Sequence, residues 1–203
     1  MRKEIKGALA LDSNKWIQLV EEIEDKQNAE KWEKYIEENN FEVIVPDIVV
    51  KELLWVISIK DKAELCHENK TRLIRLMKAG QEFAFRHIKA KHEDEYYYRA
   101  AAMLIKKHNL NAIQKMHGLC HIIDGKEMYA LHKEDVAIFI SLKELGRLYY
   151  FITHDNGIKD ALHINEIKDI LISEGIRFIL LHETTNLKNR GVTRIKIMPE
   201  YQP

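Results

Sequence analysis

Four acidic residues that lie far apart in the sequence stand beside predicted elements of secondary structure: Asp12, Glu52, Asp135 and Asp155. Asp12 and Asp155 each follow an apolar run that predicts a buried strand. Glu52 lies in the first turns of a predicted helix, and Asp135 opens another. Because ligands of an open parallel sheet bind outside the carboxyl ends of its strands, we expect the four carboxylates to converge there.

Clustered carboxylates are typical of a site for a hard divalent cation. Such groups repel one another and raise each other's pKa unless a cation compensates their charge. Oxygen-only ligands suit Mg²⁺ or Mn²⁺ rather than zinc. An ion of this kind activates water and binds a phosphate oxygen, and two ions together can do both across an in-line displacement. The predicted reaction is hydrolysis of a phosphodiester.

The first part of the chain alternates between strand and helix patterns. Apolar runs at 7–11 and 41–45 predict strands, and the second one stops at a proline. Apolar residues at helical spacing over 16–23, and again around 32–36, predict two helices between these strands. A further helix is predicted over 48–59. This order indicates a parallel α/β sheet.

The middle of the chain, about residues 60–121, is charged and mostly helical in its spacing. No linker, repeat or boundary rich in Gly or Pro interrupts the sequence. We therefore predict one domain over 1–203, with a helical insertion at about 60–121. Within it, residues 82–88 alternate in a way that fits either an extra strand or an extended connector.

The strand and helix patterns return after this region. A helix is predicted over 134–145 and ends at a glycine, and a buried strand follows over 148–153. Another helix over 164–173 leads to a strand over 176–181. Residues 192–198 alternate and predict a last strand at one edge of the sheet.

Four segments resemble the four signatures of PIN-domain nucleases and occur in that family's order. They are Leu11-Asp12-Ser13-Asn14, Val45-Pro46-Asp47-Ile48-Val49-Val50-Lys51-Glu52-Leu53, Asp135-Val136-Ala137-Ile138 and Ile152-Thr153-His154-Asp155. The resemblance spans most of the chain, except residues 60–121. It implies a three-layer α/β/α sandwich with a central, mainly parallel sheet.

The resemblance also implies an activity, that of a metal-dependent endoribonuclease. Asp12, Glu52, Asp135 and Asp155 would be both the catalytic and the metal-site residues, with supporting roles for Asn14 and Thr153. The implied cofactor is Mg²⁺ or Mn²⁺ and the implied substrate is RNA. The family further suggests a toxin or defence effector that is restrained by an inhibitory partner protein.

Other functions fit the same residues. A catalytically silent PIN-like module would bind RNA or assemble a complex without turnover. A flap-type nuclease would use the same chemistry on DNA, and a hard-metal phosphatase would act on small molecules. Residues 60–121 would supply a wall of the substrate groove, or an interface for a homodimer or for the inhibitory partner.

Each acidic residue has a simpler interpretation when it is taken alone. Asp12, Asp135 and Asp155 are each explained as helix N-caps, and Glu52 as a solvated charge on a helix. Asn14 is explained equally well as a cap of the first helix. The assignment of Asp135 is ambiguous, since the adjacent Glu134 could take its place in the metal site. We expect Thr153 to support a ligand rather than to be one.

Composition and charge limit the function classes. The chain of 203 residues has 32 Lys and Arg against 32 Asp and Glu, which is evidence against a passive nucleic-acid-binding module but says little about an enzyme. Two Cys residues indicate a reducing compartment, and no apolar stretch is long enough for a membrane span. We therefore expect a cytoplasmic protein that does not enter a membrane.

Other Cys, His, Lys and Tyr side chains give weaker indications of metal or nucleic-acid binding. Cys66-His67 and the segment 117–121 offer soft metal ligands, but the two Cys lie far apart, which does not fit a zinc site. The cluster Lys106-Lys107-His108 is able to contact phosphate, although we favour a solvated helix face for any one of these residues. The run Tyr96-Tyr97-Tyr98 is able to stack bases, although we favour packing in the core or at an interface.

Overall fold

The structure, a computed structural model, describes residues 7–22, 38, 41–58, 85–88, 96–181 and 193–198. The helix predicted around 32–36 lies outside the described residues, as does the helical spacing over 60–84.

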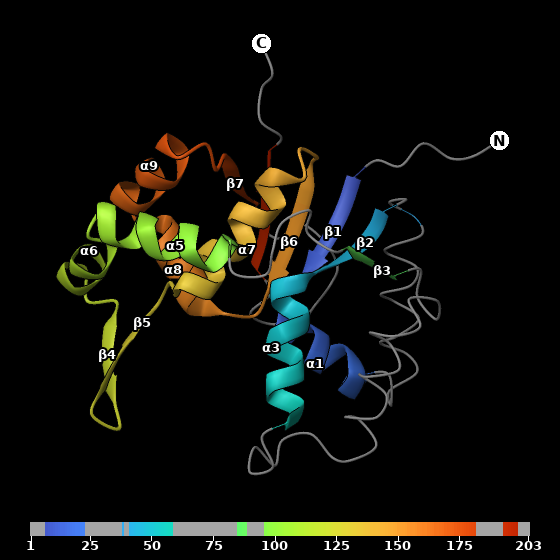
Figure 1. The fold of residues 1–203 in the computed structure, drawn as a ribbon, viewed down its shortest axis with the longest axis horizontal. Coiled ribbons are helices and arrows are strands. Elements are labelled where there is room, and N and C mark those ends of the chain that lie inside the picture. The colour runs from blue at the N-terminus through green and yellow to red at the C-terminus, as the bar shows by residue number, and fades with distance from the viewer. Residues whose placement is uncertain are drawn as a thin grey trace.

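Six described strands form one sheet, in the order β3-β2-β1-β6-β8-β7. The first four run parallel, and β8 is antiparallel to both of its neighbours. Their bounds are β1 Gly7–Leu11, β2 Phe41–Pro46, β3 Phe85–Ile88, β6 Tyr149–Thr153, β7 Phe178–Leu181 and β8 Thr193–Ile197. The sheet is therefore mixed and mainly parallel (Figure 1).

The apolar runs of the sequence form the middle of this sheet. In β1, Leu9 pairs with Val43 of β2 on one side and with Tyr150 of β6 on the other. Leu9 and Ile44 have no exposed surface. Strands that are covered on both faces read as continuous apolar runs rather than as alternating ones, and β1 has this pattern.

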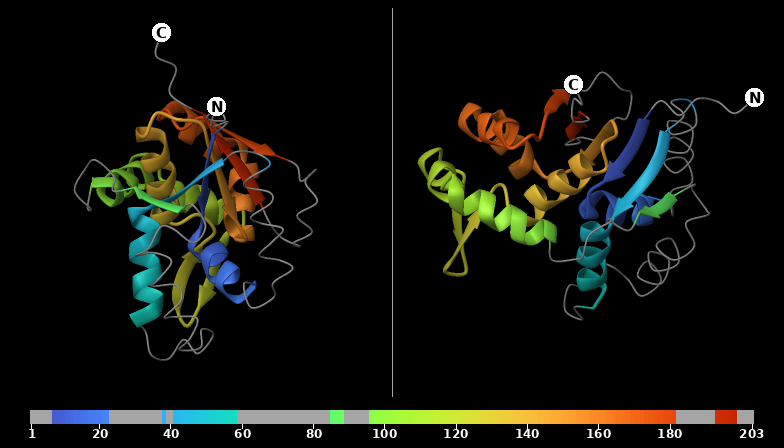
Figure 2. Two further views of the ribbon diagram at one scale, coloured as in Figure 1. Left: turned by 90° about the vertical axis from the view of Figure 1, so that its right-hand side faces the viewer. Right: turned by 45° about the horizontal axis from the view of Figure 1, so that its top comes forward.

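Seven described helices accompany the sheet. They are α1 Ser13–Glu22, α3 Asp47–Ser58, α5 Tyr96–Lys107, α6 Leu110–Met116, α7 Lys133–Glu144, α8 Asn156–His163 and α9 Asn165–Ser173. Helix α7 is buried all round over 136–142, because it contacts β2 and β8 on one side and α5 on the other. Helix α1 contacts β6 and lies across the opposite side of the sheet (Figure 2). This arrangement confirms the predicted α/β fold with helices on both faces of the sheet.

The prediction for the last strand is wrong in one respect. Strand β8 is not at an edge but lies between β6 and β7, and β7 occupies the edge. In β8, Ile195 and Ile197 are fully buried, whereas Ile179 of β7 is about half exposed. Alternation shows that one face of a strand is buried, but it does not show which strands flank it.

Residues 60–121 are not helical throughout. Residues 85–88 form β3, which pairs in parallel with β2, so that the strand interpretation of 82–88 is confirmed over this stretch. Helices α5 and α6 also fall in this range. The division into one domain with an insertion stays a prediction.

Two elements were not expected from the sequence. One is α8, which starts directly after Asp155. The other is the hairpin of β4 Cys120–Ile123 and β5 Lys126–Tyr129, which extends beyond α6 (Figure 1). Asp124 and Gly125 have φ of 51° and 74°, as the two central residues of a type I′ turn require. The Asp-Gly pair was thus a readable signal for this hairpin.

None of the helices in the described part of the chain combines the length and the apolar character needed to cross a membrane.

Candidate active site

Asp12 lies at the carboxyl end of β1, beside the carboxyl end of the parallel strand β6. Its backbone N–H donates to the carbonyl of Ile152 at 2.9 Å, which extends the pairing of the two strands by one residue. The side chain is 5% exposed. Its Oδ1 accepts from the backbone N–H of Ser13 at 2.8 Å, and its Oδ2 accepts from the Thr153 hydroxyl at 2.5 Å. Both carboxylate oxygens of Asp12 are therefore held in place.

The Thr153 hydroxyl joins the segments that follow β1 and β6. While it donates to Asp12, it accepts from the backbone N–H of Asp155 at 2.9 Å and from Nδ2 of Asn14 at 3.5 Å. Oδ1 of Asn14 in turn accepts from the backbone N–H of His154 at 3.3 Å. Thr153 has no exposed surface, so this hydroxyl is shielded from water. These bonds fit the supporting roles predicted for Asn14 and Thr153.

Asp155 is the N-cap of α8, as its simpler interpretation proposed. Its Oδ1 accepts from the backbone N–H groups of Gly157 at 2.6 Å and Ile158 at 3.4 Å. A cap of this kind uses one carboxylate oxygen. No described residue donates a hydrogen bond to Oδ2 of Asp155, so capping and a role in a metal site are compatible.

Asp135 lies in the first turn of α7, and its Oδ2 accepts from the backbone N–H of His132 at 2.7 Å. Burial raises the pKa of Asp135 well above its ordinary value, and the charges of Asp12, Asp155 and Glu52 raise it further. Asp135 is therefore within electrostatic reach of all three other acids.

Glu52 is half-buried in α3. Burial raises its pKa most, a hydrogen bond from the Ser13 side chain lowers it, and the charges of Glu134 and Asp155 raise it. Ser13 thus donates to Asp12 and also lowers the pKa of Glu52, a role that was not predicted from the sequence. The signal for it was its position directly after Asp12, in the first turn of a helix.

We call these four residues the acid cluster (Asp12, Glu52, Asp135 and Asp155). The pKa of Asp12 shows how its members affect one another. The pKa of Asp12 is raised from its ordinary 3.8 to about 6, mainly by burial, while the Thr153 hydrogen bond works in the opposite direction. The charges of Glu52 and Asp155 add to the increase. The four acids that lie far apart in the sequence therefore act on one another electrostatically in the folded chain.

The choice between Asp135 and Glu134 favours Asp135. The Glu134 side chain is 40% exposed, and its Oε1 lies 3.7 Å from Nζ of Lys133. Its charge raises the pKa of Glu52, but only Asp135 interacts with Asp12 and Asp155 as well. Glu134 therefore lies at the border of the cluster.

His154 lies beside the cluster but is not suited to proton transfer. Burial and, to a smaller extent, the charge of the fully buried Lys15 together lower its pKa to about 4. Its Nε2 is buried, and no described residue forms a hydrogen bond with it. His154 is therefore neutral at physiological pH. The sequence analysis had not singled out Lys15, since a lysine in a first helical turn is usually exposed.

Within the described segments, no group of three or more His, Cys, Asp or Glu side chains lies close enough to hold a metal ion. Cys66 and His67 lie outside the described residues. The acid cluster nevertheless fits a hard cation chemically, because all its donor atoms are oxygen. A bound cation would also offset the repulsion that raises the pKa of Asp12 and Asp135.

A model of the PIN domain matches residues 9–116, which is more than half of the chain. The chain belongs to the PIN-domain family. PIN domains are in general metal-dependent nucleases. The match includes Asp12 and Glu52, and it also covers much of residues 60–121, for which the four signatures had no counterpart. It ends before Asp135 and Asp155.

Comparisons with curated proteins and with solved structures gave no match.

Proposed function

We propose that this PIN domain is a metal-dependent endoribonuclease, in which the acid cluster holds Mg²⁺ or Mn²⁺. The observation that supports this most directly is the Thr153 hydroxyl, which joins Asp12 to the backbone of Asp155 at the ends of two neighbouring strands. The RNA substrate and the toxin or defence role, with an inhibitory partner protein, come from the family resemblance.

Some residues of the site would bind the ion, and others would hold those ligands in place. Asp12, Glu52, Asp135 and Asp155 would be the ligands of the ion, directly or through water. When bound, the ion supplies activation of the attacking water and stabilisation of charge on the phosphate. Thr153 and Ser13 hold the two oxygens of Asp12, so that the carboxylate needs little reordering.

The protonation state of Asp12 suits this role at neutral pH. Its pKa of about 6 lies below 7, so that the ionised form predominates even without a cation. A bound cation would lower this pKa again. We therefore expect cleavage to fall at acid pH, where protonated acids no longer bind the ion.

The decisive experiment incubates the wild type and Asp12→Asn with RNA and with DNA, in Mn²⁺ and in a chelator. We expect the wild type to cleave single-stranded RNA in Mn²⁺ only. Asp12→Asn should lose at least about 100-fold in rate while keeping its circular-dichroism spectrum, because the amide has nearly the same shape without the charge.

The matched control is Asp124→Asn, the same substitution in the hairpin turn, where Asn tolerates the positive φ of 51°. It should cleave like the wild type. Cleavage of DNA alone would identify the flap-type alternative, and turnover of small phosphate esters alone would identify the phosphatase. RNA binding without turnover on any substrate would identify the silent module. Undiminished cleavage by Asp12→Asn would contradict the proposed site.

A further inference from the structure

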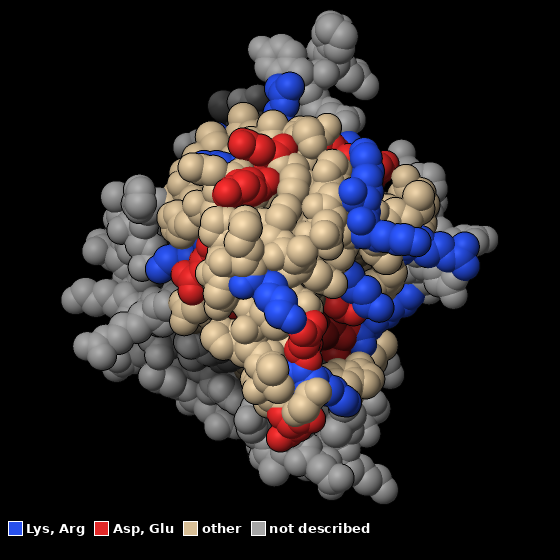
Figure 3. Space-filling view, turned by 90° about the vertical axis from the view of Figure 1, so that its left-hand side faces the viewer, with Lys and Arg blue, Asp and Glu red and all other residues tan. Residues whose placement is uncertain are grey.

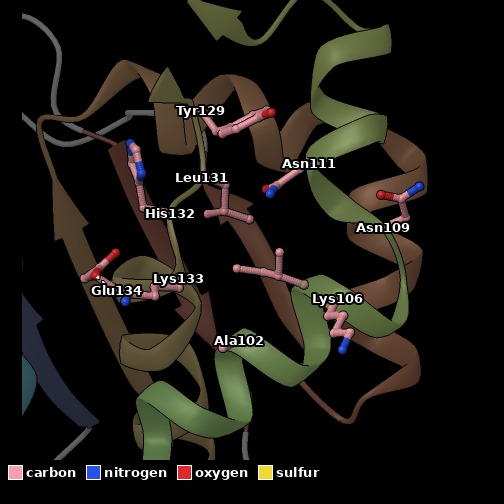
Figure 4. A pocket seen from close by; sticks show the side chains of 10 residues that line it. Ala102, Lys106, Asn109, Asn111, Tyr129, Leu131, His132, Lys133 and Glu134 are labelled. Carbon is pink, nitrogen blue, oxygen red and sulfur yellow. Dashed lines mark ion pairs between the residues drawn. The ribbon is translucent and has the colours of Figure 1, made fainter. Parts of the chain in front are cut away.

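A cleft of about 530 Å³ lies between α5, the start of α6, β5 and the start of α7. Figure 4 shows His132, Lys133 and Glu134 at one end and Lys106 and Asn109 at the other. Tyr129 and Asn111 lie along a third border. The cleft is thus built by elements that meet only in the folded chain.

One end of the cleft adjoins the acid cluster. The backbone N–H of His132 donates to Asp135, and the charges of Glu134 and His132 act on Glu52. Residues 132–134 therefore line the cleft and also lie beside the cluster. A molecule that occupied the cleft would extend from the acids towards Lys106.

The lining combines an apolar base with polar borders. Leu131 is buried, and Ile105 is half-buried beside it. Around them are the exposed amides of Asn109 and Asn111 and the exposed ammonium of Lys106. Apolar surface and aromatic rings suit bases and sugars, while amides and ammonium groups suit hydroxyl and phosphate oxygens.

Acidic and basic side chains lie in different places on the surface, although the chain has no net charge. On the face shown in Figure 3, acidic side chains lie in a hollow, and Lys and Arg side chains border it. The Lys and Arg side chains of such a border attract a phosphate chain even without a cation, and a bound cation would offset the repulsion between the phosphates and the acids.

We propose that this cleft binds the part of a single-stranded RNA that lies next to the cleaved phosphate. This proposal rests on the proposed function. Tyr129 stacks on a base, Lys106 contacts a phosphate, and Asn111 contacts a base edge or a 2′-hydroxyl. A single strand fits because its bases can leave the stack and enter a concave site, whereas a duplex offers only its outer surface.

The test measures binding with chelator present, so that no cleavage occurs. The probes are a fluorescent single-stranded RNA of mixed sequence, the single-stranded DNA of the same sequence, and a blunt RNA duplex. We expect the wild type to bind the single-stranded RNA more tightly than the other two. Tyr129→Ala should weaken this binding about tenfold, because a stacked base is lost. Tyr129→Phe keeps the ring but loses the hydrogen bond from the Tyr129 hydroxyl to Glu127 at 2.6 Å, and it should weaken binding by less than Tyr129→Ala does.

Lys106→Ala tests the cleft independently of Tyr129, since this exposed residue on α5 can be replaced without disturbing the hairpin. It should weaken binding and lower the salt dependence by about one released ion. The matched control is Lys115→Ala, which removes the same charge from α6 outside the cleft and breaks an exposed ion pair with Glu127, while Glu127 can still accept from the Tyr129 hydroxyl. Its Kd should stay within about twofold of the wild type.

The outcomes separate this inference from the proposed nuclease activity. Unchanged binding by both Tyr129→Ala and Lys106→Ala would overturn the cleft as the binding site, even if the wild type cleaves RNA in Mn²⁺. Equal binding of the duplex or of the DNA would overturn the assigned substrate. Losses confined to the cleft variants, in a protein that cleaves nothing, would support the cleft and contradict the nuclease.

Discussion

At the scale of single residues, the Thr153 hydroxyl is the most constrained group of the site. It is fully buried, it donates to Asp12, and it accepts from the backbone of Asp155. A hydroxyl can donate one hydrogen bond and accept two, so that Thr153 fixes one acid while it fixes the loop that carries another. A methyl group in its place could do neither.

We therefore predict that Thr153→Val lowers the cleavage rate roughly 10- to 100-fold with little change in shape. Because the Thr153 hydrogen bond lowers the pKa of Asp12, its loss should also raise that pKa, so that the acid limb of the pH–rate profile moves to higher pH. Thr153→Ser keeps the hydroxyl and should restore both the rate and the profile. A slower Val variant with an unshifted profile would show that Thr153 has only a packing role.

The raised pKa of Asp12 also predicts how stability depends on pH in chelator. Between the unfolded value of 3.8 and the folded value of about 6, the folded state binds more protons than the unfolded state. The free energy of unfolding should therefore fall as pH rises through this range, by up to about 3 kcal/mol from this group. The raised pKa values of Glu52 and Asp135 act in the same direction.

Urea unfolding at pH 4 and at pH 7 measures this effect. Asp12→Asn should lose less stability between the two values than the wild type, since it lacks the group that titrates. With Mn²⁺ at pH 7 the wild type should gain more stability than the variant. Equal pH dependence in the two proteins would mean that Asp12 is not buried as described.

At the scale of elements, the loop from β6 to α8 determines where Asp155 lies. Gly157 is closely packed in the first turn of α8, because a Cβ atom there would lie 2.9 Å from the carbonyl oxygen of Ala130 and 2.9 Å from Oδ1 of Asp155. The start of α8 can therefore hold Asp155 in its capping geometry only while residue 157 has no side chain.

We predict that Gly157→Ala lowers the free energy of unfolding by roughly 1–3 kcal/mol, because the backbone of Ala130 or the Asp155 cap must move. The cleavage rate should fall as well. Gly146→Ala is the control, since its φ of +62° strains any side chain but no atom lies within 4 Å of the new Cβ. It should cost about 1 kcal/mol in stability and leave the cleavage rate unchanged. Equal rates in the two variants would contradict a role for this turn in placing Asp155.

At the scale of the whole molecule, one apolar core connects the elements. Its buried residues run from β1 through α7 and β6 to β8, and α5 packs on α7. No described segment has a core of its own that is separate from this one. Strands β1, β2, β6, β7 and β8 thus contribute side chains to a single packed interior.

This core predicts one cooperative unfolding transition for residues 1–203. Far-UV circular dichroism reports on the helices and tryptophan fluorescence reports on buried Trp16, which is 2% exposed. The two urea midpoints should coincide, as expected for a single domain. Two separated midpoints would contradict the single-domain prediction.

Much of the fold could be predicted from the sequence because the relevant patterns are local. The run at 7–11 and the proline after 41–45 marked strands that the structure contains. The hairpin was missed although its Asp-Gly turn was readable, and α8 was missed because its apolar stripe is short. The position of β8 was wrong because the order of strands depends on contacts between distant residues.

The sequence by itself determined which acids follow the strands and which apolar runs must be buried, since both depend on residue type and on neighbours along the chain. Only the tertiary structure decided that the charge of Asp12 raises the pKa of Asp135, and that Thr153 joins two strand ends. It also formed the cleft beside the acid cluster from four separate elements. Hydrophobic burial is non-directional, so that the apolar pattern specifies a core, whereas the packing of distant segments places the groups at its border.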